Sequence, residues 1–294
     1  MVKRTRRKLK ELNLIDDFLA NAMATSTEYS QVCFRRILSV LLNKEIGDIS
    51  VKAQNIFIGD DTDLRGIRLD VEITEYDDDP TTIYDIEPHL TNDTHYAKHN
   101  RYYQAKIDSH YVPSGLKDFS KMHNLYVITI TNFDIFKEDY MLYTFKQTCI
   151  EEPSIEYEDG LRFLYFNTKG TKGGSESILN MLRYMENSTA DNAVDEATKE
   201  ISKYVEEVKN NAELETRIMT LQDKIDIIRE EGKEEGREEG IKEGLKIGNQ
   251  EGKLAILVAQ INDGEISIES AAKRMNMSKA DFKEYMNSEL IDMQ

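Results

Sequence analysis

The fold of this chain is decided by the stretch Leu69-Asp70-Val71-Glu72-Ile73-Thr74 and by a second one, Ile83-Tyr84-Asp85-Ile86-Glu87-Pro88-His89. In both, apolar and polar side chains alternate, which is the pattern of a β-strand with two different faces. Between them, residues 75–82 contain four acids and a proline, a composition typical of an exposed turn. The two strands are therefore predicted to form an antiparallel hairpin.

This hairpin places two carboxylates, Asp70 and Glu87, on the polar faces of neighbouring strands. Two carboxylates in such positions can share one divalent cation. A sheet with one solvated face shows the same alternation, and acids on a solvated face are common. Spacing alone thus leaves two interpretations open, a metal site or ordinary solvated strands, and the second is the more frequent case.

An ordered set of motifs surrounds the hairpin. Arg68-x-Asp70 precedes the turn, Asp85-Ile86-Glu87-x-His89 follows it, and Arg101-Tyr102-Tyr103-Gln104 comes shortly after. Further matching segments are 126–130, 132–134, 143–145, 166–170 and the glycine-spaced tail. Taken in this order, the motifs resemble the Rpn family of recombination-promoting nucleases and transposase-like proteins, which belongs to the PD-(D/E)XK nuclease superfamily. The resemblance covers most of the chain.

The resemblance implies an α/β fold with a restriction-endonuclease-like (PD-(D/E)XK) mixed sheet flanked by helices. It also implies hydrolysis of DNA phosphodiesters by a divalent-metal-dependent endonuclease, in a recombination or mobile-element setting. Asp70 and Glu87 would hold Mg²⁺ or Mn²⁺, and the Pro88 backbone carbonyl could be a further ligand because proline keeps its C=O. Such a cation lowers the pKa of bound water and offsets charge on the scissile phosphate. No small-molecule cofactor is expected.

Three other residues are candidates for the active site. His89 stands where the superfamily has lysine and this family often has glutamine, so it would position water or act as a cation. Gln104 matches the family's Tyr-Tyr-Gln motif and would bind a phosphate or a water, although an ordinary helix residue looks the same. Glu28, in the first turn of a helix expected at 26–43, is a weaker candidate, since superfamily nucleases often carry an acid there. Its alternative role is helix-end electrostatics.

The overall charge limits how the protein could bind DNA. A net charge of -17 and a pI near 4.8 argue against non-specific binding, which depends on neutralising phosphates with Lys and Arg. Local basic patches would have to bind the phosphates. Lys98, Arg101 and Lys106, on a helix expected at 96–111 and interleaved with tyrosines, are the best candidates. Residues 2–10 contain six basic residues and no acid, and form either a solvated tail or a DNA-binding arm.

Composition also indicates where the protein resides. Cys33 and Cys149 lie among apolar residues and form no disulfide framework, which favours a reducing compartment. No apolar run reaches membrane-spanning length, and no signal-peptide core follows the basic N-terminus. A cytoplasmic protein without a membrane partner is therefore expected.

Four segments are predicted along the chain. These are a basic N-terminal tail and lead-in at 1–25, the nuclease-like domain at 26–190, a helical, glycine-spaced linker at 191–252, and a small helical unit at 253–294. A coiled-coil seam is expected within the linker and predicts a homo-oligomer. Its positions are Leu214, Ile218, Leu221, Ile225 and Ile228.

The tail of the chain leaves further alternatives open. Glycine recurs at every fourth position from Gly232 to Gly252, which fits a marginal helix or a flexible charged linker. The last unit resembles a helix-turn-helix, but its second helix balances Lys279 and Lys283 with two acids, so packing or oligomerisation is favoured over DNA reading. The alternative for the whole protein is a catalytically inactive nuclease fold that acts as an oligomeric interaction or DNA-associated module.

Overall fold

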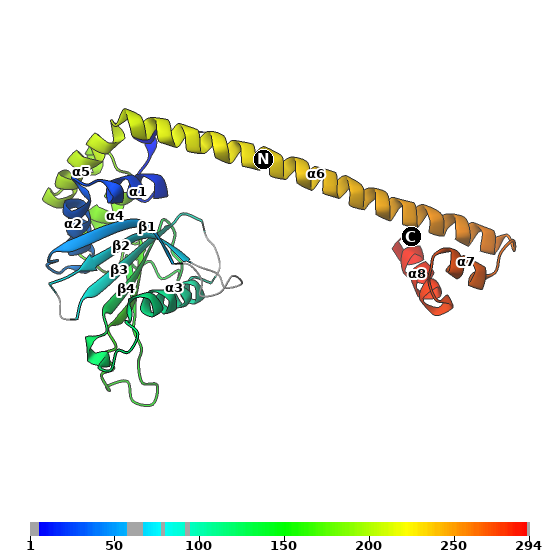
Figure 1. The fold of residues 1–294 in the computed structure, drawn as a ribbon, viewed down its shortest axis with the longest axis horizontal. Helices are drawn as coiled ribbons and strands as arrows, with labels where there is room; N and C mark the ends of the chain where they lie inside the picture. The colour runs from blue at the N-terminus through cyan, green and yellow to red at the C-terminus, as the bar shows by residue number, and fades with distance from the viewer. Residues whose placement is uncertain (1–5, 58–66, 78–79, 92–94, 293–294) are drawn as a thin grey trace. The chain divides into compact units, whose positions relative to one another are not determined.

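The structure is a computed structural model that describes residues 6–57, 67–77, 80–91 and 95–292 (Figure 1). The chain divides into two compact units, Met1–Thr220 and Leu221–Gln294. Within the described ranges, every helix is too short or too polar to cross a membrane.

The first unit is built on a six-stranded mixed sheet with the order β1-β2-β3-β4-β6-β5. The strands are β1 (Ile49–Phe57), β2 (Ile67–Glu75), β3 (Thr82–His89), β4 (Asn124–Thr131), β5 (Leu142–Phe145) and β6 (Leu161–Asn167). Strands β1 to β3 form an antiparallel meander, β3, β4 and β6 are parallel, and β5 is an antiparallel edge strand. The predicted mixed α/β sheet is confirmed. Residues 78 and 79 of the predicted turn lie outside the described ranges.

Helices cover both faces of this sheet (Figure 1). On one face lie α1 (Asp17–Thr25), α2 (Ser30–Leu42), α4 (Glu176–Glu186) and α5 (Glu196–Lys209). The other face carries α3 (Tyr96–Tyr111), which connects β3 to its parallel neighbour β4. Short 3-10 turns lie at Leu9–Glu11, Phe119–Lys121 and Ala190–Asn192. Two parallel neighbours such as β3 and β4 require a crossover connection, and an α-helix such as α3 is its usual form.

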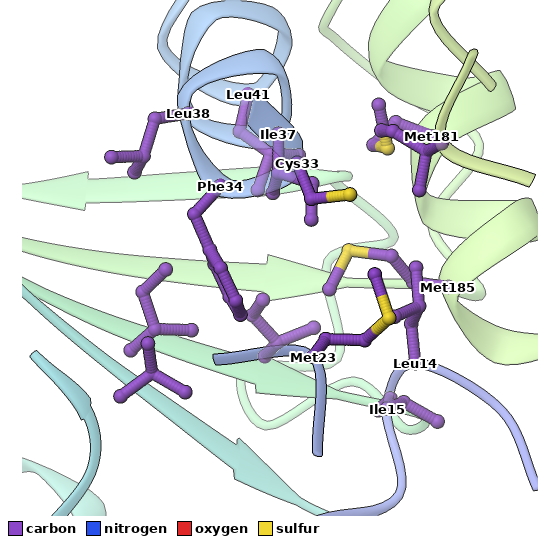
Figure 2. Close-up of a cluster of buried hydrophobic side chains, with 14 of the residues drawn as sticks. Leu14, Ile15, Met23, Cys33, Phe34, Ile37, Leu38, Leu41, Met181 and Met185 are labelled. Carbon is purple, nitrogen blue, oxygen red and sulfur yellow. The ribbon is translucent and has the colours of Figure 1, made fainter. Parts of the chain in front are cut away.

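The main core lies between the sheet and the four helices. Phe34, Ile37, Leu38 and Leu41 recur at helical spacing and form the buried stripe of α2. Figure 2 shows this stripe facing Met181 and Met185 of α4 as well as the N-terminal segment. A second, smaller cluster lies under α3 and consists of Leu69, Ile83, Ile107, Leu125 and Val127.

The N-terminal segment contributes to the main core, whereas the sequence predicted a tail and lead-in up to residue 25. Residues 1–5 of that basic stretch lie outside the described ranges. Leu9, Leu14 and Ile15 are buried, and the N–H of Ile15 donates to the Met185 carbonyl at 3.0 Å. The N–H of Leu9 donates to the Glu215 carboxylate at 2.9 Å. The first unit therefore includes this segment, and its extra helix α1 precedes the predicted domain start.

Helix α6 (Ala212–Asn262) is continuous through all six glycines. Of the two predicted alternatives for this segment, a marginal helix and a flexible charged linker, the structure has the helix. Leu214 and Ile218, the first two positions of the predicted seam, pack into the main core of the first unit. Leu221, Ile225 and Ile228 are exposed. The seam is thus divided, and only its later positions remain available to a partner helix.

The second unit has its own small core. The end of α6, α7 (Ile268–Arg274) and α8 (Lys279–Asp292) meet around Leu254, Leu257 and Phe282. Ser267 and Ser278 accept hydrogen bonds from the backbone N–H groups three residues later, which is how serine caps a helix. The end of α6, α7 and α8 thus form a small helical unit around this core.

Candidate functional site

The pairing of β2 with β3 brings the two predicted carboxylates together. Glu72 lies opposite Asp85 in the antiparallel register, and the backbone N–H of Asp70 donates to the Glu87 side chain at 3.0 Å. Asp85 and Glu87 alternate with Tyr84 and Ile86, whose side chains lie in the main core. The acidic side chains of β3 therefore lie on the opposite face, under α3.

Strand β2 departs from regular alternation at Asp70. Val71 packs into the main core, whereas Leu69 packs into the cluster under α3. On β1, Gln54 lies between the pairs that join Ala53 to Val71 and Asn55 to Leu69, and its φ is 52°. One residue on each strand lies between these two pairs, so the register is unchanged and the irregularity is local to Gln54 and Asp70. The β2–β3 ladder ends here, next to Pro88, which has no N–H to extend it.

We call the four acids Asp70, Glu72, Asp85 and Glu87 the acid row, and burial dominates the electrostatics of two of them, Asp85 and Glu87. The side chains of Asp85 and Glu87 are 0% and 4% exposed. Burial raises the pKa of both carboxyls well above the usual range, and the charge of Asp70 raises each pKa further. A side-chain hydrogen bond with the Glu87 carboxyl counteracts part of the rise in the pKa of Asp85.

Asp85 and Glu72 are the two members of the acid row that the sequence analysis did not select, and Asp85 is the more deeply buried of them. Neither carboxylate oxygen of Asp85 accepts from an N–H or a basic side chain of the residues that the structure describes, and the group beside it is the Glu87 carboxyl. A buried carboxylate without a partner is costly, so such a group requires a proton or a cation. The signal was present in the Asp85-x-Glu87 spacing, because residues two apart on a strand share one face.

Glu72 connects the acid row to two residues that were also not selected. The Tyr111 hydroxyl, at the end of α3, donates to the Glu72 carboxylate, and the Lys52 ammonium of β1 lies 3.3 Å from the same group. Burial of Tyr111 and its bond to Glu72 raise the pKa of the phenol to about 12. Burial alone lowers the pKa of Lys52, but Tyr111 and Glu72 outweigh this effect and raise it. Lys52 therefore remains a cation at this end of the acid row.

His89 lies at the other end of the acid row, where β3 ends. It is two residues beyond Glu87 and therefore on the same face of the strand. Its ring packs against two rings of α3, with centroid distances of 5.2 Å to Tyr96 and 5.5 Å to His99. Helix α3 thus holds the imidazole beside the acids.

The remaining candidates lie on α3 or before α2, and not on the strands that carry the acid row. Gln104 donates its amide N–H to Asp108 one turn later on α3, and this is a different partner from the predicted phosphate or water. Lys98 and Arg101 are exposed on α3, and Lys106 is half-buried. Glu28 lies before α2, on the opposite side of the sheet from the acid row, and its charge raises the pKa of the neighbouring Tyr29.

The acid row consists of two pairs of cross-strand neighbours, Glu72 with Asp85 and Asp70 with Glu87. In the described part of the chain, no group of three or more His, Cys, Asp or Glu side chains converges as an assembled metal centre does. The oxygen atoms are nevertheless of the kind that Mg²⁺ and Mn²⁺ prefer, and no N–H or basic side chain in these ranges pairs with those of Asp85. The residues therefore fit a divalent cation chemically. The chain matches no protein-family model, no curated protein and no solved structure.

Proposed function

We propose that this protein is a divalent-metal-dependent DNA endonuclease of restriction-endonuclease-like fold, acting in a recombination or mobile-element setting. One observation carries the proposal. Buried carboxyls of Asp85 and Glu87 adjoin each other and Asp70 across two paired strands, and in the described ranges no N–H or basic side chain pairs with the Asp85 oxygens. Burial of several acids together is unfavourable for folding, and such groups are often arranged for function.

In this proposal Asp70 and Glu87 hold Mg²⁺ or Mn²⁺, the Pro88 carbonyl is a further ligand, and Asp85 joins the ligand set. The cation, when bound, supplies an activated water and charge stabilisation at the scissile phosphate. His89, held by Tyr96 and His99, positions the attacking water by a hydrogen bond. Since glutamine could do the same, we expect His89→Gln to retain more activity than His89→Ala. The exposed Lys98 and Arg101 contact DNA phosphates.

Nicking of supercoiled plasmid tests the proposal. The wild-type protein is assayed with Mg²⁺, Mn²⁺, Ca²⁺ and EDTA, beside Asp70→Asn, Glu87→Gln and the control Glu156→Gln, which removes an exposed acid from a loop. We expect nicking with Mg²⁺ or Mn²⁺ in the wild type and control, and background nicking in the two site variants. Circular dichroism establishes that the variants are folded. Full activity in either site variant would reject the site.

The second candidate is an interaction protein that keeps the fold without catalysis. It is favoured by His89, which replaces the lysine or glutamine of the resemblance, and by the lack of a group of three converging metal ligands among the described residues. The melting temperature of the wild type with and without Mg²⁺ discriminates between the two candidates. A ligand that binds only the folded state raises this temperature, so an inactive protein without a cation site should show no shift.

A further inference from the structure

A pocket of about 270 Å³ lies next to the acid row in the first unit. It is formed by β1, β2 and β3 together with the end of α3 and the segment that follows it. Lys52 and Tyr111 line it on one side, Tyr76 on another, and Ile83 contributes apolar surface. Lys121 adds a second ammonium group, and the His123 ring completes this part of the lining. Among the described residues that line the pocket, none is acidic, although the chain as a whole has a net charge of -17.

The lining combines positive charge with aromatic rings. The Lys52 ammonium lies 5.7 Å from the centroid of the Tyr111 ring, and the Tyr76 side chain is 59% exposed. His123 is held in place by Asp108 at 3.0 Å. Ammonium groups bind phosphates, and tyrosine rings stack on nucleobases of any sequence. The ligand that matches this lining is an anion that carries a flat ring, which is the chemistry of a nucleotide.

The pocket is connected directly to the acid row. Lys52 and Tyr111 both bind Glu72, and Glu72 lies opposite Asp85 in the strand register. Through these contacts, a ligand in the pocket adjoins the carboxylates to which we assign the cation. The volume is just below the usual range for small-molecule sites, so it suits one nucleotide and excludes a base-paired duplex.

We propose that this pocket receives one unpaired nucleotide of the DNA strand next to the scissile phosphate, with its base against Tyr76 and Tyr111 and its phosphate at Lys52 and Lys121. This inference rests on the proposed nuclease function and specifies its substrate class. The preferred DNA has a single-stranded gap, tail or branch beside the cleaved bond. An enzyme that acts beside an unpaired nucleotide avoids the cost of unpairing a base.

Binding is measured first under conditions without cleavage. The full chain, in EDTA and separately in Ca²⁺, is titrated into a single-stranded oligonucleotide and into the matching duplex, each containing 2-aminopurine. The site variants are Tyr76→Ala and Lys121→Gln. Their controls are Tyr157→Ala, which removes a tyrosine of similar exposure (54%), and Lys203→Gln, an exposed lysine of α5 across the sheet.

We expect the wild type to quench the single-stranded probe more strongly than the duplex. Tyr76→Ala should weaken single-strand binding about 10-fold, as loss of one base stack does, and both controls should bind like the wild type. Equal affinity of site variants and controls would overturn the inference. So would competition by a free nucleoside monophosphate at the same concentration as the oligonucleotide, because the pocket would then serve free nucleotides.

Cleavage separates this inference from the proposed function. With Mg²⁺, wild-type protein should cut a gapped duplex faster than a fully paired one, and Tyr76→Ala should reduce this preference while still cutting the paired duplex. Metal-dependent cleavage without a preference for the gapped duplex would overturn only the pocket assignment. No metal-dependent cleavage of any DNA would reject the nuclease itself, whatever the binding titrations show.

Discussion

The buried carboxyl of Asp85 should make the free energy of unfolding depend on pH. An aspartate in an unfolded chain has a pKa of about 3.9, and burial raises the pKa of Asp85 well above its usual value in the folded state. Between this value and the raised pKa of the folded state, the folded protein therefore holds a proton that the unfolded chain has lost. Because the folded state binds more protons, stability falls as pH rises, by up to about 1.4 kcal/mol per pH unit for one group.

We predict that Asp85→Asn removes part of this dependence, since an amide does not titrate. Between pH 5 and 8 in EDTA, the free energy of unfolding of the wild type should fall relative to that of the variant. Urea denaturation at each pH measures both, with Glu156→Gln as an exposed control that should parallel the wild type. Parallel curves for Asp85→Asn and wild type would show that Asp85 titrates normally.

At the level of single residues, the sequence predicted the meeting of Asp70 and Glu87 but not the burial around them. Alternation and the acidic turn are local signals, and they are sufficient to place these residues on adjacent strands. Burial of Asp85 depends on α3, whose Ile107 joins Ile83, Leu125 and Val127 over this face. Such a long-range contact has no local signature. The irregularity at Asp70 likewise depends on the backbone of Gln54 on another strand.

At the level of elements, α6 is the helix whose stability is most reduced by its own sequence. Glycine in a helix costs about 0.8 to 1 kcal/mol relative to alanine, and six glycines occur between Gly232 and Gly252. A methyl group at any of these six positions would meet no atom within 4 Å. Intrinsic preference therefore decides the effect of a substitution there.

We predict that Gly240→Ala and Gly244→Ala each stabilise α6 by about 0.8 to 1 kcal/mol and raise its helicity. Circular dichroism at 222 nm during thermal unfolding of the full chain measures both effects. Glu239→Ala, on the same exposed stretch, should change either quantity much less. A lower melting temperature in the glycine variants would instead indicate that another helix packs closely against this face.

The sheet and most helices were predictable because their signals are local. Strand β3 shows the alternation from which it was predicted, and α4 and α5 begin at the capping side chains of Ser175 and Asp195. Helix α1 was not predicted, because residues 17–25 have weak patterning and are buried by distant elements. The coiled-coil seam was predicted only in part for the same reason. Apolar periodicity shows that a helix face is buried, but it does not show whether a partner chain or the chain's own core buries it.

At the level of the whole molecule, we predict self-association through the exposed part of the seam. Leu221 and Ile225 are each 44% exposed and Ile228 is 67% exposed, so a second copy of the helix would remove apolar surface from water. The double variant Leu221→Glu/Ile225→Glu should be monomeric at a micromolar concentration where the wild type is a dimer. Sedimentation and light scattering measure the mass.

The control for this prediction is Ile247→Glu, which places the same charge at an exposed α6 position outside the seam. It should leave the oligomeric state unchanged. A monomeric wild type would contradict the prediction. In that case the apolar pattern would serve only to pack Leu214 and Ile218 in the first unit.

The burial of the N-terminal segment has a consequence for how the protein is made. Leu9 bonds to Glu215, which is 206 residues later, and Ile15 bonds to Met185. A ribosome therefore releases the first buried residues long before their partners exist, and the first unit cannot close while it is being translated. N-terminal-first folding, the usual order during synthesis, is not available to this unit. A chain that terminates before Ala212 would lose the Glu215 carboxylate that accepts from the Leu9 N–H, and would become a substrate for chaperones and proteases.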